Sequence, residues 1–333
     1  MNNQQESDFI AIGDITTDAF IRLSNPSAHT RLDKQKLELC VNFGDKIPYE
    51  SVDVIPAVGN SANASVCAAH LGLRTALVTD LGDDPNGKEC IESLTKNGVS
   101  INYVTAHKDI KTNYHYVLCF EDDRTILVKH ENYPYKLPAL GATNSVYLSS
   151  LASSAGNYYE EIADYLETNQ KIILTYQPGT YQVKAGITGF ERIYKRTDIF
   201  VSNKTEAQRI LRTNESDIRK LLDGINLAGP KNVLLTNGPE GAYLKTENGR
   251  CLFMPPYPDP KPPVNRTGAG DAYAATFSSA MVLGIPPEEA LRWASVNAMA
   301  VVQKVGAQRG LLTRNEIENF LQSAPKNFTA EGL

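Results

Sequence analysis

Short apolar runs alternate with segments of helical periodicity along most of the chain. The runs FIAIG (9–13) and RTALVTDLG (74–82) have the length and composition of buried strands. Between them, NSANASVCAAHLG (60–72) repeats small and apolar residues at helical spacing and ends on a glycine. Strands that alternate with helices predict an α/β fold with a mostly parallel sheet covered on both faces. Further strands are predicted at 145–150, 171–176, 198–202 and 232–238, and further helices at 86–98, 157–168, 203–211, 215–226 and 269–283.

Two regions interrupt this alternation. Residues 20–57 hold a polar stretch followed by a more apolar one, and residues 112–130 alternate as a β-hairpin with EDDR at the turn. Tyr114 and Tyr116 share one face of this hairpin, because alternate residues of a strand point to the same side. Two arrangements fit the pattern equally well: a small β lid outside the main sheet, or an extension of the edge of that sheet.

Composition and charge narrow the range of partners. The chain has 333 residues, which is enough for one large α/β domain or two ordinary ones. Lys and Arg number 33 against 38 for Asp and Glu, so the net charge is -5, and the basic residues are scattered. We therefore expect neither nucleic acid nor an anionic membrane as a partner. No apolar run approaches the roughly 20 residues that a membrane-spanning helix needs.

The five cysteines are odd in number and widely spaced, and no C-x-x-C pair occurs. This pattern argues against a zinc site or a disulfide framework and favours reduced thiols in the cytosol. The N-terminal segment MNNQQESDF is polar and lacks the apolar core of a signal peptide. The expected location is therefore cytoplasmic. The cysteines are Cys40, Cys67, Cys90, Cys119 and Cys251.

The stretch NRTGAGDAYAA (265–275) combines two glycines, a helix start and a carboxylate. Thr267 is the expected cap of that helix. Gly268 and Gly270 carry no side chains, so backbone N–H groups at the positive end of the helix can approach an anion closely. Asp271, in the first turn, suits a base that takes a proton from a hydroxyl attacking phosphorus. The alternative is an ordinary helix start, in which Asp271 only complements the helix dipole.

Two other glycine motifs fit this chain poorly. A dinucleotide fingerprint needs a third glycine at position 273, where Tyr273 stands, and it normally follows an early strand. The G-x-x-x-x-G-K-[ST] motif of P-loop nucleoside triphosphatases occurs nowhere in the sequence. The loop is therefore neither a P-loop nor a good dinucleotide site.

The segment TGAGDAYAATF resembles the signature of the ribokinase/PfkB carbohydrate kinases, a family of sugar and nucleoside kinases that includes adenosine kinase. The resemblance continues in the family's order from residue 9 to about residue 322. It implies a three-layer α/β/α ribokinase-like fold with a mostly parallel central sheet, in a single kinase domain over 1–333. A small β lid is then expected from parts of 20–57 and 112–130. The resemblance also implies an ATP-dependent phosphotransferase that uses Mg²⁺, acts on a hydroxymethyl group of a sugar or nucleoside, and forms a homodimer through the lid.

The same resemblance assigns catalytic and substrate-binding residues. Asp271 would be the general base, and Gly268, Ala269 and Gly270 would form the anion hole. IGDITTD resembles the family's sugar-binding loop, and AVGNSANASV resembles its glycine–asparagine motif. Taken alone, these segments fit equally a solvated loop and a helix cap. The expected substrate-binding residues are Asp14, Asp18, Gly59 and Asn63.

A second group of residues would face the nucleotide. NKTE resembles the family's Asn-x-x-Glu element, in which the Asn places phosphates and the Glu organises water on Mg²⁺. LLTNGPEGAYL resembles the nucleotide loop, and VNAMAVV resembles the helix beside adenine. The alternatives are a common helix N-cap for the first element and a bond to a neighbouring helix for the asparagine of the last. The expected cofactor-binding residues are Asn203, Glu206, Thr236, Gly238, Gly241 and Asn297.

The chain departs from the family's pattern at two places. Val58 replaces the first glycine of the pair that acts as a hinge for lid closure, and Asn265 replaces an aspartate that helps to bind a monovalent cation. The second change weakens any expectation of a K⁺ requirement. Arg266 beside it either binds phosphate or lies on the surface.

Two other functions stay open at this point. A catalytically silent sugar- or nucleoside-binding protein on the same fold is favoured by Val58 and Asn265. An α/β oxidoreductase would use the glycine loop for a dinucleotide. The acceptor is not determined either: Tyr114 and Tyr116 could stack on a nucleobase, or pack only against each other. The early insertion, residues 24–55, is expected to shape the substrate site.

Overall fold

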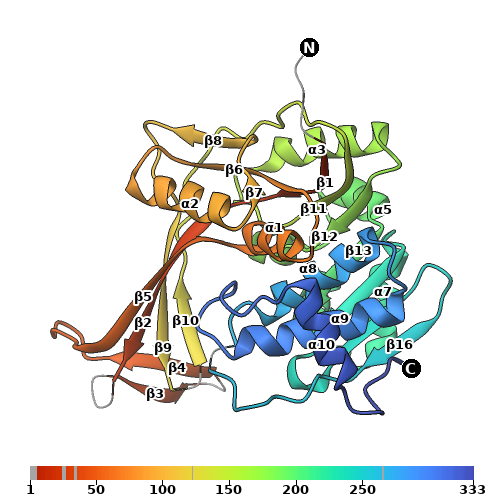
Figure 1. Ribbon diagram of the computed structural model, residues 1–333. Helices are drawn as coiled ribbons and strands as arrows, with labels where there is room; N and C mark the ends of the chain where they lie inside the picture. Colours follow the sequence, from red (N-terminus) through yellow and green to blue (C-terminus); the bar gives the residue numbers. More distant parts are fainter. Residues whose placement is uncertain (1–5, 25–27, 34–35, 122, 265) are drawn as a thin grey trace.

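The central element is a large sheet whose strands are mostly parallel (Figure 1). The computed structural model describes residues 6–24, 28–33, 36–121, 123–264 and 266–333. The sheet order is β17-β16-β15-β14-β13-β12-β11-β1-β6-β7, with β8 paired to β6, and the three strands from β15 to β17 run antiparallel. Its strands are β1 (Ser7–Ile12), β6 (Thr75–Gly82), β7 (Val99–Ser100), β8 (Val104–His107), β11 (Thr143–Leu148), β12 (Ile173–Tyr176), β13 (Ile199–Asn203), β14 (Asn232–Thr236), β15 (Ala242–Lys245), β16 (Cys251–Met254) and β17 (Glu331–Gly332).

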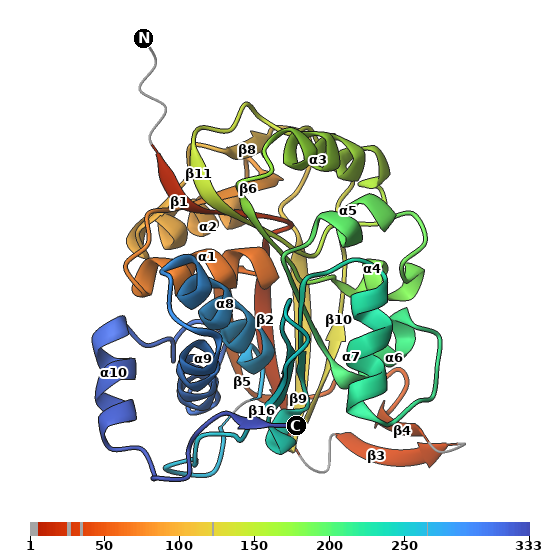
Figure 2. The ribbon, with the colours of Figure 1, turned by 90° about the vertical axis from the view of Figure 1, so that its right-hand side faces the viewer.

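Helices cover both faces of this sheet, so the predicted three-layer α/β/α architecture is confirmed (Figure 2). Along β1, Phe9 and Ala11 pack into one core while Ile10 and Ile12 pack into the other. This explains the uninterrupted apolar run, since alternate residues of a strand face opposite sides. One face carries α1 (Asn60–His70), α2 (Pro85–Lys96), α8 (Ala269–Val282), α9 (Pro287–Val302) and α10 (Arg314–Gln322). The other carries α3 (Gly156–Thr168), α4 (Thr180–Ala185), α5 (Glu191–Arg196), α6 (Lys204–Ile210) and α7 (Ile218–Leu227).

A second sheet of four strands projects from this body (Figure 1). Its order is β10-β9-β2-β5, so the two regions that interrupt the alternation pair with each other and not with the edge of the central sheet. Its inner face buries Phe20, Ile55 and Val117 against Val305, which follows α9. The strands are β2 (Thr16–Leu23), β5 (Tyr49–Val58), β9 (Tyr114–Phe120) and β10 (Asp123–Leu127), and a separate hairpin is formed by β3 (Ala28–Asp33) and β4 (Lys36–Val41).

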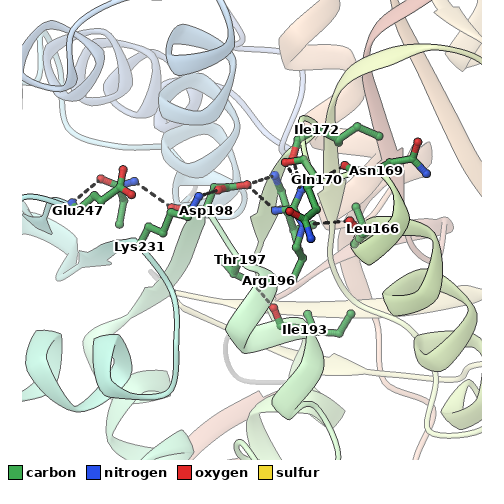
Figure 3. Close-up of polar contacts among 12 residues, drawn as sticks. Leu166, Asn169, Gln170, Ile172, Ile193, Arg196, Thr197, Asp198, Lys231 and Glu247 are labelled. Carbon is green, nitrogen blue, oxygen red and sulfur yellow. Dashed lines mark hydrogen bonds and ion pairs between the residues drawn. The ribbon is translucent and has the colours of Figure 1, made fainter.

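A polar clamp holds the amino ends of the central strands together (Figure 3). Arg196, at the end of α5, donates to the carbonyl of Leu166 in α3 and to the carboxylate of Asp198 at 2.8 Å. Asp198 in turn accepts the backbone N–H of Leu174 at 2.8 Å and the ammonium of Lys231 at 2.7 Å. The Arg196 side chain is only 11% exposed, so these bonds lie largely out of water. The clamp therefore ties α3, β12, β13 and β14 at the end of the sheet away from the site described next.

Two smaller predictions can also be compared with the structure. All five cysteines are free thiols, as predicted from their spacing. Among the described residues, no helix has both the length and the apolar composition needed to cross a membrane.

Candidate active site at the carboxyl ends of the strands

The carboxylate of Asp271 is the centre of a converging hydrogen-bond network. Its Oδ1 accepts the side-chain amides of Asn60 at 2.9 Å and of Gln177 at 3.0 Å. Its Oδ2 accepts the amide of Asn63 at 2.8 Å. The donors come from α1 and from the residue that follows β12, so three elements meet at this one side chain.

The protonation of Asp271 is set by opposing effects. Burial raises the pKa of this carboxyl above its usual range, and the negative charge of Asp18 adds to the rise. The three amide donors, from Asn63, Gln177 and Asn60, lower the pKa because they stabilise the ionised form more than the protonated one. Asp271 is therefore a carboxylate whose basicity exceeds that of an exposed aspartate.

The two glycines before Asp271 have different reasons for being glycine. Gly268 has φ 84°, and a Cβ there would lie 2.3 Å from the Cβ of Ala307, so the fold itself excludes a side chain. At Gly270 a Cβ would meet no heavy atom within 4 Å, and this residue lines a large cavity. The open peptide at Gly270 thus leaves room for a ligand. The N-cap of α8 is Gly268, so the prediction that Thr267 caps this helix was wrong.

Asp14 follows β1 and is 5% exposed. Its Oδ1 accepts the hydroxyl of Tyr135 at 2.9 Å, and its Oδ2 lies 3.3 Å from Nδ1 of His130. Gly59 packs against the same residue: it has φ 113°, and a Cβ would lie 2.8 Å from the Asp14 carbonyl oxygen. Gly59 is therefore required for this close approach, because a side chain would collide with backbone.

Asp18 faces the same region from β2. It is the register partner of His115 in β9, whose Nδ1 lies 3.4 Å from Asp18 Oδ1. The rings of His115 and His130 are 5.4 Å apart, so the two aspartates and two histidines form one group. Despite these short contacts, four buried atoms of this group make no hydrogen bond within the described part of the chain: Asp14 Oδ2, Asp18 Oδ1, His115 Nε2 and His130 Nδ1. Buried polar atoms normally have hydrogen-bond partners. Hydroxyl groups of a bound ligand can both donate and accept, so a ligand rich in hydroxyls would supply the missing bonds.

The tyrosines of β9 lie on the other face of the second sheet. Tyr114 and Tyr116 contact each other at 5.2 Å between ring centroids, and they alternate with His115, which is the residue that faces Asp18. Of the two alternatives, the structure shows the two rings packed against each other. Because alternate residues of a strand point to opposite faces, these rings point away from the face that carries Asp18 and would not stack on a nucleobase bound there.

A cavity of about 770 Å³ opens beside Gly270, the residue that precedes Asp271. Its volume is in the range of small-molecule sites. It lies over the carboxyl ends of β13 and β14 and the start of α8, with Ala298, Met299 and Val302 of α9 on its wall. Arg266 is exposed and lines the cavity, which places this cation beside a prospective ligand. The predicted residues on its wall are Asn203, Glu206, Thr236, Gly238, Gly241, Ala269 and Gly270.

Asn203 and Glu206 form a reciprocal capping box at the start of α6. Asn203 Oδ1 accepts the N–H of Glu206 at 2.8 Å, and Glu206 Oε2 accepts the N–H of Asn203 at 2.9 Å. The capping alternative is thus realised, but both residues also line the cavity. Burial raises the pKa of Glu206, and the charge of Asp271 raises it further. A cation bound near Glu206 would lower this pKa.

Asn297 does not belong to this site, so the prediction that it contacts adenine was wrong. Its side chain is fully buried. Its amide donates to Thr276 Oγ1 at 2.8 Å, and its Oδ1 accepts the N–H of Leu312 at 2.9 Å. Helical spacing placed it at the edge of an apolar stripe, but α8 packs over that edge, so the amide serves a bond between helices.

The side chains of the site are suited to Mg²⁺ and not to a transition metal. Among the described residues, no three His, Cys, Asp or Glu side chains converge as a metal cage. Mg²⁺ commonly keeps several waters and binds through one or two carboxylates together with phosphates, so Glu206 suits it better than it suits a transition metal. Asn265, on which the K⁺ expectation rested, lies outside the described residues.

Sequence analysis missed several residues of the site. Two of them carried a weak signal: Asn60 stands inside the glycine–asparagine segment, and Gln177 directly follows a predicted strand, where parallel sheets carry their sites. His115 and His130 could be assigned only after the pairing of β2 with β9 was known. Their roles depend on contacts between segments far apart in the chain.

Comparison with known proteins finds related kinases. The sequence matches the pfkB family of carbohydrate kinases over residues 41–314. It is 28% identical to a ribokinase of Bacillus subtilis, covering 84% of this chain and 92% of that protein. It is 28% identical to a nucleoside kinase of Methanothermobacter thermautotrophicus, covering 82% of this chain and 84% of that protein.

Solved structures show the same fold. The ribokinase of Arabidopsis thaliana, solved as a complex with ribose and ATP, superposes with a TM-score of 0.78 at 22% identity. The superposition covers 96% of this chain and 99% of that one. The family match spans most of the chain, including the Gly268–Asp271 loop, and the fold agrees with it. The chain therefore belongs to the pfkB family of carbohydrate kinases.

Proposed function

We propose that this kinase transfers the γ-phosphoryl group of ATP to a hydroxymethyl group of a sugar or nucleoside, with Asp271 as general base. The observation that carries the proposal is the position of Asp271. It lies in the first turn of α8 directly after Gly270, which lines the large cavity, and its carboxylate accepts from Asn63 and feels the charge of Asp18. A base at that point can reach an acceptor on one side and a phosphate on the other.

On the acceptor side, Asp14, Asp18 and Asn63 would bind hydroxyls of the substrate. Asp14 Oδ2 and Asp18 Oδ1 are buried and make no hydrogen bond, which supports this role for the two aspartates. Gly59 allows Asp14 to sit against the start of α1. Asp271 would accept the proton of the hydroxymethyl group as its oxygen bonds to phosphorus. The bond between the γ-phosphorus and the oxygen that bridges it to the β-phosphorus then breaks, and that oxygen leaves with ADP.

On the donor side, the N–H groups of Ala269, Gly270 and Asp271, following Gly268, would stabilise negative charge on the transferred group. The remaining cavity wall would hold the rest of ATP: Asn203 near the phosphates, and Thr236, Gly238 and Gly241 near phosphate or ribose. Mg²⁺, when bound through water to Glu206, would neutralise charge on the phosphates. Arg266 is an exposed cation on this wall and would add to that neutralisation.

The second sheet would act as a lid in a single kinase domain. Its inner face carries Asp18 and His115, so closure would complete the acceptor site and exclude water, which competes as a phosphoryl acceptor.

ADP release should be measured with a panel of pentoses, hexoses and nucleosides in the presence of Mg²⁺ and ATP. We expect at least one neutral polyol to stimulate ADP release and to appear as its phosphate ester. Ligand binding in a thermal shift without any turnover would contradict the proposal and favour the catalytically silent binding protein.

The outer face of the second sheet suggests the assembly. Val54, Ala19, Tyr116 and Leu127 are register neighbours across its four strands, and all but Ala19 are about half exposed. We propose that two copies pair through this face, because a row of exposed apolar side chains is typical of interaction surfaces. Sedimentation should then give a dimer, and Tyr116→Glu should shift it to the monomer. A monomeric wild-type protein at micromolar concentration would contradict the pairing.

A further inference from the structure

The loop that follows α9, residues 303–313, contacts the second sheet through several side chains. Val305 joins the apolar cluster of that sheet, and Gly306 lies so close to Ile55 that a Cβ would be 2.4 Å from its Cδ1. Arg309 approaches Asp53 of β5 at 3.5 Å. The same loop continues directly from the part of α9 that lines the large cavity. It therefore connects the cavity wall with the second sheet.

Gln308 in this loop makes two hydrogen bonds. Its amide nitrogen donates to the carbonyl oxygen of Ala57 at 2.7 Å and to Oδ1 of Asn63 at 2.9 Å. A backbone carbonyl can only accept, so the Gln308 amide must present its NH₂ group at this point. Asn63 must then present its oxygen to Gln308, which leaves its NH₂ group to donate to Asp271 Oδ2 at 2.8 Å. Gln308 thus holds the Asn63 amide in the orientation in which its NH₂ group faces the carboxylate.

Ala57 is the junction between the second sheet and α1. It is fully buried and has φ 59°, in the left-handed region that non-glycine residues avoid. Its N–H donates to Cys90 Sγ at 3.2 Å, so both of its peptide groups are held by side chains. A strained backbone persists only where its surroundings hold it, and Gln308 supplies one of these two bonds.

We propose that Gln308 is a positioning residue for the reaction, linking the junction of the second sheet to the protonation state of Asp271 through Asn63. This inference rests on the proposed function. When the junction is in the observed place, Gln308 keeps Asn63 donating to Asp271 and keeps that carboxylate ionised.

The sign of the pH effect follows from the groups that face Asp271. Burial raises its pKa, while Asn60 and Asn63 of α1 and Gln177 after β12 lower it. The charge of Asp18 of β2 raises it, and Glu206 of α6 and Tyr147 of β11 feel the charge of Asp271 in turn. Removing the donor of Gln308 frees Asn63 to turn away, which raises the pKa of Asp271 further. Because the base must be ionised, the acid limb of kcat then moves to higher pH.

The test is the variant Gln308→Met, with Gln303→Met as the matched control. Gln303 lies in the same loop and donates only to the carbonyl of Lys261 at 3.1 Å, away from Asn63. We expect Gln308→Met to lower kcat about 10-fold, to move its acid limb upward and to leave the KM for ATP unchanged. Gln303→Met should match wild type. Gln308→Glu, which keeps the volume but loses the donor when ionised, serves as the second variant should Gln308→Met fail to fold.

A second readout does not require turnover. Hydrogen–deuterium exchange over residues 53–60 should be faster in Gln308→Met than in wild type or Gln303→Met. Unchanged exchange there, or a lower kcat with an unmoved pH profile, would overturn the inference and leave Gln308 a structural residue. A wild-type enzyme that phosphorylates no acceptor would instead overturn the proposed function, while the exchange result still decides the link to Ala57.

Discussion

Asp271→Asn is expected to lower kcat by at least ~10²-fold while ATP still binds, since general bases contribute effects of that order. The substitution keeps the size of the side chain but removes the atom that accepts the proton. It also brings an NH₂ group against one of the three amide donors, Asn60, Asn63 or Gln177. The neighbouring amide must then turn over, so a modest loss of acceptor affinity is expected as well.

Turnover is measured by ADP release with the best acceptor, and ATP binding by titration calorimetry. Asp223→Asn is the control, because Asp223 is 56% exposed and contacts only Lys245 at 2.6 Å on the surface. In wild type, kcat should rise with pH through the raised pKa of Asp271, above the range of an ordinary aspartate. Turnover near the wild-type value in Asp271→Asn would contradict the proposal that Asp271 is the general base.

Arg196→Ala is expected to lower the free energy of unfolding by about 3 kcal/mol, the scale for breaking a largely buried ion pair. Arg196 satisfies carbonyl groups of the turn after α3, at Asn169, Gln170 and Ile172, as well as the carboxylate of Asp198 (Figure 3). Its loss leaves the Ile172 carbonyl and the Asp198 carboxylate, which are largely buried, with fewer donors. The amino ends of β12 and β13 should therefore loosen first.

The matched control lies on the same helix. Arg192 contacts Glu160, Asp164 and Glu167, but this cluster is exposed and screened by water, so Arg192→Ala should have a much smaller effect. Urea unfolding of both variants, followed by circular dichroism, gives the comparison. Equal losses in the two variants would contradict the view that burial of the Arg196 clamp is what stabilises the sheet.

Local sequence predicted the elements well because each depends on neighbours along the chain. The apolar run at 9–13 became β1, and the spacing at 60–72 became α1. The glycine loop was also predictable, since a bare backbone before a helix suits an anion whatever surrounds it. Its cap was not predictable: Gly268 takes that place because Ala307 packs against it from a distant loop.

By itself, the sequence determined the alternation of strands and helices, the glycine loop before a helix and the family. The tertiary structure decided which side chains meet. It set Asn297 between helices and away from the cavity, and turned His115 and not Tyr114 or Tyr116 toward Asp18. It also brought Gln308 to Asn63, 245 positions away. The physical reason is that periodicity depends on nearby residues, whereas such contacts depend on how whole helices and sheets pack against each other.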